Sequence, residues 1–174
     1  MTGSAKIFEW VPGYLAWLNL KWQPEGLDHH LAVIRRASGF LEADVCYWST
    51  VLRDDNWRAP LVGCACVIAS KNRGFFGDLC YRFTSGSMVA PQLVVAIGLI
   101  HPTEAISFFR AQLDMPILKK DPRRVVSIQT ALARLGGSKE SEIAFDGWSS
   151  TDRDDAELAH TVVGQHWDFW SARL

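Results

Sequence analysis

The sequence predicts an all-α protein built from consecutive helical hairpins. Two stretches, residues 56–83 and 87–113, share one layout, in which a helix-capping type of residue stands four positions before a proline and an apolar run follows. In both stretches the apolar residues recur at helical spacing and end at glycine, proline or asparagine turn signals. We therefore expect helices throughout and at most incidental strand.

The stretch APQLVVAIGLIHP, residues 90–102, is the most apolar part of the chain, and we assign it to a buried helix. The run from Met88 to Ile100 covers 13 residues, whereas a membrane-spanning helix needs about 20. A core strand would usually be shorter, and apolar residues continue at helical spacing beyond the run. We expect two successive helices that break at His101 and Pro102.

The two hairpins also align residue by residue. At an offset of 32, Leu61, Val62, Cys64, Val67 and Ile68 fall on Leu93, Val94, Ala96, Leu99 and Ile100, and at an offset of 33, Phe75 and Phe76 fall on Phe108 and Phe109. A fainter third copy begins near Pro122, because Pro60, Pro91 and Pro122 are each 31 residues apart. The alignment places Ala96 and Gly98 where two helices pass closely.

The 174 residues suit one domain with three parts: N-terminal cap helices in 1–55, repeats in 56–145 and a C-terminal cap helix in 146–174. The predicted inward faces are Leu27, Leu31 and Ile34; Val45, Trp48, Val51 and Leu52; and Leu158, Val162 and Trp167 or Phe169. Thr151 or Asp152 is the expected N-cap of the last helix, and residues 136–150 are the most loop-like region.

The doubled pattern resembles the HEAT-like helical-repeat proteins. The resemblance covers residues 56–145 and rests on Pro60/Pro91, on Ala65 or Ala96, and on the pairs Phe75-Phe76 and Phe108-Phe109. It implies a short right-handed α-solenoid of helical hairpins with degenerate end caps, in which each hairpin buries its apolar face against the next.

Composition and charge exclude several classes of partner. The chain is 48% hydrophobic and 21% charged with a net charge of −1, so it lacks the basic surface typical of nucleic-acid binders. The first residues contain no uninterrupted apolar core of a secretory signal. We expect a cytoplasmic protein that binds neither nucleic acid nor membranes.

No residue pattern predicts a metal, a cofactor or a catalytic group. His29 and His30 are adjacent and point to different faces of a helix, and His160 and His166 are six apart rather than four. The four cysteines stand in apolar context and are expected to be buried. Nucleophile, phosphate-loop and metalloprotease motifs are absent from the sequence.

The polar turns supply the candidate partner-binding residues, which combine tryptophan and arginine with acidic groups as interfaces do. They are Asp54, Asp55, Trp57, Arg58, Asn72 and Arg73. Residues 53–58 enter one predicted helix and residues 70–73 leave it, so the two groups stand roughly 21 Å apart. If a partner uses one end only, we expect the end at residues 53–58.

We therefore predict a non-enzymatic protein-binding module. In its size, its helical hairpins and its degenerate end caps, the chain resembles small bacterial HEAT-like immunity proteins. This resemblance implies a cognate toxin or effector as the partner. The alternatives are an enzyme of unknown chemistry on a helical fold, whose site is assembled from distant residues, and a general scaffold or adaptor.

Overall fold

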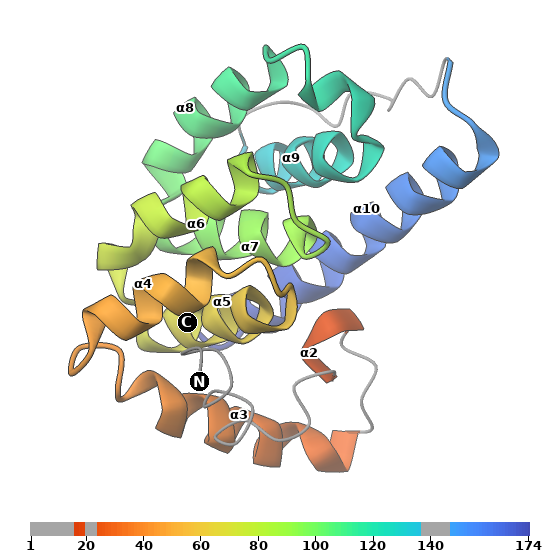
Figure 1. Ribbon diagram of the computed structural model, residues 1–174. Helices are drawn as coiled ribbons and strands as arrows, with labels where there is room; N and C mark the ends of the chain where they lie inside the picture. The colour runs from red at the N-terminus through yellow and green to blue at the C-terminus, as the bar shows by residue number, and fades with distance from the viewer. Residues whose placement is uncertain (1–15, 20–23, 137–146) are drawn as a thin grey trace.

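The computed structural model describes residues 16–19, 24–136 and 147–174, and every regular element within these ranges is helical (Figure 1). The α-helices are α2 (Ala16–Asn19), α3 (Pro24–Ser38), α4 (Val45–Arg53), α5 (Arg58–Ser70), α6 (Phe76–Thr84), α7 (Ala90–Ile100), α8 (Pro102–Leu113), α9 (Pro122–Arg134) and α10 (Ser150–Ser171). Two 3₁₀ helices, η1 (Arg73–Phe75) and η2 (Leu118–Lys120), precede α6 and α9. The all-α prediction is confirmed for the described part of the chain.

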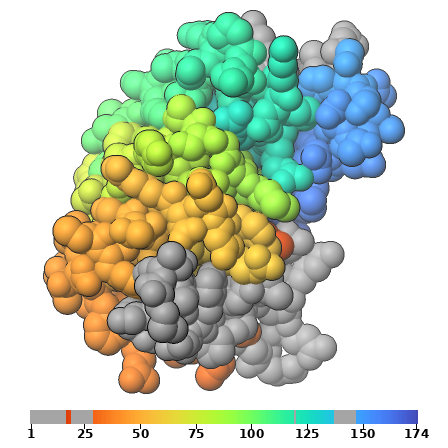
Figure 2. Space-filling view, in the orientation of Figure 1, coloured from red at the N-terminus to blue at the C-terminus, as the bar shows by residue number. Residues whose placement is uncertain are grey.

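The helices form two adjoining rows with a third layer on one side. In Figure 1, α4, α6 and α8 lie beside one another, and α5, α7 and α9 form the inner row, in which α7 contacts both α5 and α9. α10 packs along α9 and α7, while α3 packs on α5. The space-filling view in Figure 2 shows α10, in blue, beside α9 and the outer row as a continuous band from orange to teal.

The predicted hairpins correspond to α5 with α6 and to α7 with α8. Residue His101 separates α7 from α8, and Pro102 opens α8, as expected, since proline tolerates the first turn of a helix. The third proline, Pro122, opens α9 in the same way. The helix that follows α9 in the chain and packs on it is α10. Residues 137–146, part of the predicted third repeat and loop, lie outside the described residues.

Helix α7 is the centre of the core. All of its residues except Leu99 are buried, and it contacts α5, α6, α8, α9 and α10. A helix surrounded by others is apolar on all sides, which explains the unusual composition of residues 90–100. No helix in the described ranges is both long and apolar enough to cross a membrane.

Gly98 brings α10 close to α7. A Cβ atom at this position would lie 2.7 Å from Cη2 and 2.8 Å from Cζ3 of Trp167, closer than real Cβ contacts. Gly63 of α5 has the same role against α4, where a Cβ would lie 2.6 Å from Cδ2 of Leu52. The predicted close passage at Gly98 is therefore confirmed, with α10 as the neighbouring helix.

Two predicted inward-facing residues of the cap helices need correction. Leu158 and Val45, predicted to face inward, are 48% and 54% exposed. Leu158 lies outside because the side of α10 that faces α7 and α9 carries Ala156, Ala159, Val162, Val163, Trp167 and Trp170. Val45 opens α4, one turn before its buried residues Trp48, Val51 and Leu52.

The N-cap of α10 is Ser149 rather than Thr151 or Asp152. Ser149 and Asp152 form a capping box, in which each side chain bonds the backbone N–H of the other residue. At the other end of the chain, Leu31 and Ile34 are buried as predicted, whereas the side chain of Leu27 and residues 1–15 lie outside the described residues.

Two of the four cysteines are buried as predicted, and two are not. Cys64 and Cys66 are buried in α5, and burial raises the pKa of both thiols; burial likewise raises the pKa of the half-buried Cys80 to about 12. Cys46 is exposed, because it precedes the buried stripe of α4. The thiols of Cys64, Cys66 and Cys80 therefore stay protonated at neutral pH.

An aromatic contact joins α2 to the end of α10. The ring of Trp17 stacks on Trp170 with centroids 5.4 Å apart, and its centroid lies 6.0 Å from that of Phe169. His166 is buried beneath this contact, and burial lowers its pKa to about 4 against the opposing effect of hydrogen bonds with the backbone of Leu18 and Trp17. The folded protein therefore stabilises the neutral imidazole of His166 relative to the protonated one.

We expect Gly98→Ala to lower the free energy of unfolding by about 1–3 kcal/mol, because the new methyl group overlaps the Trp167 ring. The control is Gly77→Ala in α6, where a methyl group would meet no atom of the described residues within 4 Å and alanine is the better helix former. Urea denaturation measures both. Equal effects of the two substitutions would show that α10 does not pack closely on Gly98.

Acid should destabilise the protein through His166. Its pKa is lower in the folded state than the ordinary value of 6.5, so its contribution is complete above pH 6.5 and is lost as the pH falls towards 4, by about 3 kcal/mol at pH 4. Urea denaturation between pH 7 and 4 should therefore give a flatter stability profile for His166→Leu than for the original chain. His29→Ala, at an exposed position, is the control whose profile should match that of the original chain.

Candidate functional site

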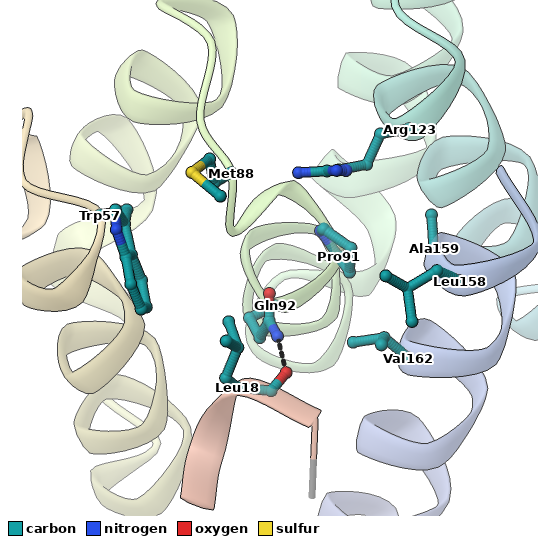
Figure 3. Close-up of a pocket in the computed structure, with 9 residues that line it drawn as sticks. All are labelled: Leu18, Trp57, Met88, Pro91, Gln92, Arg123, Leu158, Ala159 and Val162. Carbon is teal, nitrogen blue, oxygen red and sulfur yellow. Dashed lines mark hydrogen bonds between the residues drawn. The ribbon is translucent and has the colours of Figure 1, made fainter. Parts of the chain in front are cut away.

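The N-terminal ends of the inner helices border a groove with a volume of about 150 Å³ (Figure 3). Its lining comes from α2, from the segments that precede α5 and α7, from the first turns of α7 and α9, and from α10. The lining residues are Leu18, Trp57, Met88, Pro91, Gln92, Arg123, Leu158, Ala159 and Val162. Segments far apart in the sequence thus converge on one surface.

The walls of this groove are apolar and partly exposed. Trp57 stands on one side and α10 contributes Leu158 and Val162 on the other, with Met88 above the opening in Figure 3. Met88 is 60% exposed and Leu158 is 48% exposed, while Trp57 is half-buried. Large apolar side chains on opposite rims of a groove leave hydrophobic surface that a ligand can cover.

The floor of the groove carries one polar group. Gln92 is 3% exposed, and its Nε2 donates a hydrogen bond to the backbone carbonyl of Leu18. Its Oε1 is buried and has no hydrogen-bond partner among the described residues. Figure 3 shows this oxygen on the side of the amide away from Leu18. A buried acceptor without a donor is costly, and its burial keeps this oxygen out of reach of a ligand in the groove.

A second, more open groove of about 480 Å³ adjoins the first and shares Trp57, Met88 and Arg123 with it. The rest of its lining is Asp55, Arg82, Gly86, Ser87, Asp121 and Asp155. We call the first the apolar groove and the second the polar groove.

Ion pairs surround the polar groove. Arg82 Nη1 lies 2.7 Å from Asp55 Oδ1, and Arg123 Nη2 lies 2.8 Å from Asp155 Oδ1. Arg82 is buried, and its Nη2 also donates a hydrogen bond to the carbonyl of Gly86, 2.9 Å away. This bond holds the turn between α6 and α7 in place. The charged side chains here are therefore held by one another and by the backbone.

The structure brings together four of the six predicted partner-binding residues. Asp55 and Trp57 line the grooves, and Arg58 places its guanidinium 4.5 Å from the Trp57 ring centroid. Asp54 precedes them and accepts a hydrogen bond from the Asn56 N–H at 2.7 Å. These residues form the entrance to α5.

Asn72 and Arg73 lie at the far end of α5, about 20 Å away along a 13-residue helix. Asn72 accepts a hydrogen bond from the Gly74 N–H at 2.8 Å and caps η1. Arg73 Nη2 lies 3.5 Å from Glu104 Oε1, and the Arg73 carbonyl is 2.8 Å from His101 Nε2. Both residues hold the turn of the hairpin in place and take no part in either groove.

Sequence reasoning missed several groove residues, namely Met88, Gln92, Leu158, Arg82 and Arg123. One signal was present, because Gln92 is the one strongly polar residue between Met88 and Ile100. A polar side chain inside an apolar run marks a place where the buried helix meets a polar atom or a cavity.

Among the side chains that the structure describes, no three His, Cys, Asp or Glu residues are grouped in a way that would hold a metal ion. Comparison of the chain with protein-family models, with curated proteins and with solved structures finds no match.

Proposed function

We propose that the protein is a non-enzymatic protein-binding module whose partner covers the two grooves at the N-terminal ends of the inner helices. One observation carries the proposal: exposed Met88 and Leu158 line one groove together with half-buried Trp57. Aromatic and methionine side chains beside arginines and a polar rim are the composition that protein interfaces favour. The predicted residues Asp55, Trp57 and Arg58 belong to this surface.

The finer architecture that we propose is a short right-handed α-solenoid of HEAT-like hairpins. Its support is the sequential packing of α5 with α7 and of α7 with α9, together with an outer row formed by α4, α6 and α8. In such an array α10 lies across two helices of the inner row, so the chain itself covers that face. This leaves the edge where the inner helices begin as the surface for a partner.

The more specific version of the proposal is that the partner is a bacterial toxin or effector, which the protein neutralises by occupying it in the cytoplasm. Its support is the resemblance of the repeat pattern to small helical-repeat immunity proteins. Co-expression with the product of each neighbouring gene tests it. A product that stops growth alone and is harmless beside this protein would support the specific version, and rescue should fail when Trp57 is replaced by aspartate.

Photo-crosslinking in the native host should locate the interface. A benzophenone amino acid at Leu158, on the groove rim, should give a protein adduct of defined mass, because this exposed side chain would contact the partner. The matched control is Ser107, an exposed position on α8 in the outer row. Adducts from Ser107 with none from Leu158 would place the interface on the outer row instead.

Charge reversal distinguishes the two ends of α5. Arg58→Glu should weaken partner binding at least tenfold, equivalent to about 1.4 kcal/mol, because an interfacial cation becomes an anion. The fold should tolerate the change, since Arg58 is the first residue of α5, where a helix favours acidic side chains.

Arg73→Glu, at the far end of the same helix, should leave the affinity unchanged. Calorimetric titration of both variants with the captured partner gives the comparison, and thermal melting checks that each variant is folded. Loss of affinity in Arg73→Glu alone would move the binding surface to the turn at residues 70–73.

A further inference from the structure

We propose that a cavity between α2, α5, α7 and α10 is a binding site for one water molecule, which donates one hydrogen bond to Nε2 of His166 and another to Oε1 of Gln92. The inference does not depend on the proposed partner. It concerns how the inner helices and α2 are joined, because buried waters that satisfy unpaired polar atoms are part of a protein's structure.

The cavity is lined by buried residues and has the size of one water. Its volume is about 10 Å³, which holds a single water molecule and excludes any organic ligand. Each lining residue is at most 4% exposed. The lining consists of Trp17 from α2, Leu61, Cys64, Ala65 and Ile68 from α5, Gln92 from α7, and His166 and Trp170 from α10.

Two of the lining residues carry a buried polar atom that the protein leaves unpaired. Gln92 donates from Nε2 to the carbonyl of Leu18, which fixes the amide, and its Oε1 has no hydrogen-bond partner among the described residues. The same holds for Nε2 of His166. An unpaired polar atom inside a protein is costly. Since both residues line one cavity, a donor inside it can serve both atoms.

The protonation of His166 makes its Nε2 an acceptor. Burial lowers the pKa of this side chain to about 4, so the ring is neutral at pH 7 and only one of its nitrogens carries a proton. The ring also forms hydrogen bonds with the backbone of Leu18 and Trp17, whose carbonyls require a protonated nitrogen. Because Nε2 takes no part in a hydrogen bond among the described residues, the proton belongs on Nδ1.

The site therefore calls for a small neutral molecule with two donors. Nε2 of His166 and Oε1 of Gln92 are both acceptors and cannot bond each other. A cation would lack compensation, since none of the lining residues is acidic. Burial raises the pKa of the Cys64 thiol and keeps it protonated, but a thiol is a weak donor with a single hydrogen. Water supplies two O–H donors in the space available.

A crystal structure of the full chain, at a resolution that shows ordered waters, tests the site directly. We expect one isolated density peak in the cavity, at about 2.7–3.2 Å from both His166 Nε2 and Gln92 Oε1. Nitrogen-15 NMR of the histidine rings tests the same arrangement in solution. The His166 signals at pH 7 should be those of a neutral ring with the proton on Nδ1.

Magnetic relaxation dispersion of oxygen-17 counts the waters that stay inside the protein, and Gln92→Met should lower this count by one. The variant leaves the water a single acceptor, whereas buried waters need at least two polar partners. The matched control is Ser127→Ala in α9, which also removes a buried polar group. Ser127 already donates to the Arg123 carbonyl and does not line the cavity, so the count should not change. Thermal melting checks that both variants fold, and the measurements on the original chain stand without them.

Several outcomes would overturn the inference. A cavity without density, or a water bonded to only one of the two atoms, would exclude the bridge. A His166 ring with its proton on Nε2 would show that this nitrogen is a donor, which can bond Gln92 Oε1 without a water. A folded Gln92→Met variant with the same number of internal waters as the original chain would place the long-lived waters elsewhere.

Discussion

The burial of α7 is the constraint on which the rest of the structure depends. This helix contacts α5, α6, α8, α9 and α10, and ten of its eleven residues are buried. Every neighbour must therefore present an apolar face to it, and the neighbours come from both predicted hairpins and from the C-terminal helix. Small residues decide how close they come, since Gly98 leaves room for the ring of Trp167. The proposed binding surface is a consequence, because the sides of α7 are covered by other helices, while Pro91 and Gln92 of its N-terminal turn line the apolar groove.

Several polar contacts join residues whose separation in the sequence is close to the spacing of Pro60, Pro91 and Pro122. Arg73 and Glu104 are 31 residues apart, Arg123 and Asp155 are 32 apart, and Thr130 and His160 are 30 apart. Prolines 60, 91 and 122 are spaced by 31. This common spacing is what the proposed stacking of similar helical units would give. Of these pairs, Arg73–Glu104 is exposed on both sides and contributes little to stability.

The sequence was sufficient to predict the hairpins but not the surfaces that they leave open. Periodicity and proline position identify α5 to α9, because each helix carries its own start signal and apolar run. Helical spacing also gives two candidate inward faces for α10, and only packing against α7 and α9 decides that Ala159 lies inside and Leu158 outside. The same limit applies to Arg82: its burial follows from its contact with Asp55, 27 residues away, which no local pattern encodes. Asn72 and Arg73 were selected for their composition, yet their hydrogen bonds serve the hairpin turn.

If the proposed function holds, affinity and selectivity have separate origins in the two grooves. In the polar groove Arg82, Arg123 and the carboxylates of Asp55 and Asp155 already satisfy one another, so a partner gains little attraction there and must match their arrangement. In the apolar groove the protein leaves hydrophobic surface exposed at Met88 and Leu158, and a partner that covers this surface gains free energy. In the proposed complex the apolar contact therefore sets how tightly a partner binds, and the surrounding ion pairs set which partners fit. Trp57 and Met88 line both grooves, so a change at either residue would affect affinity and selectivity together.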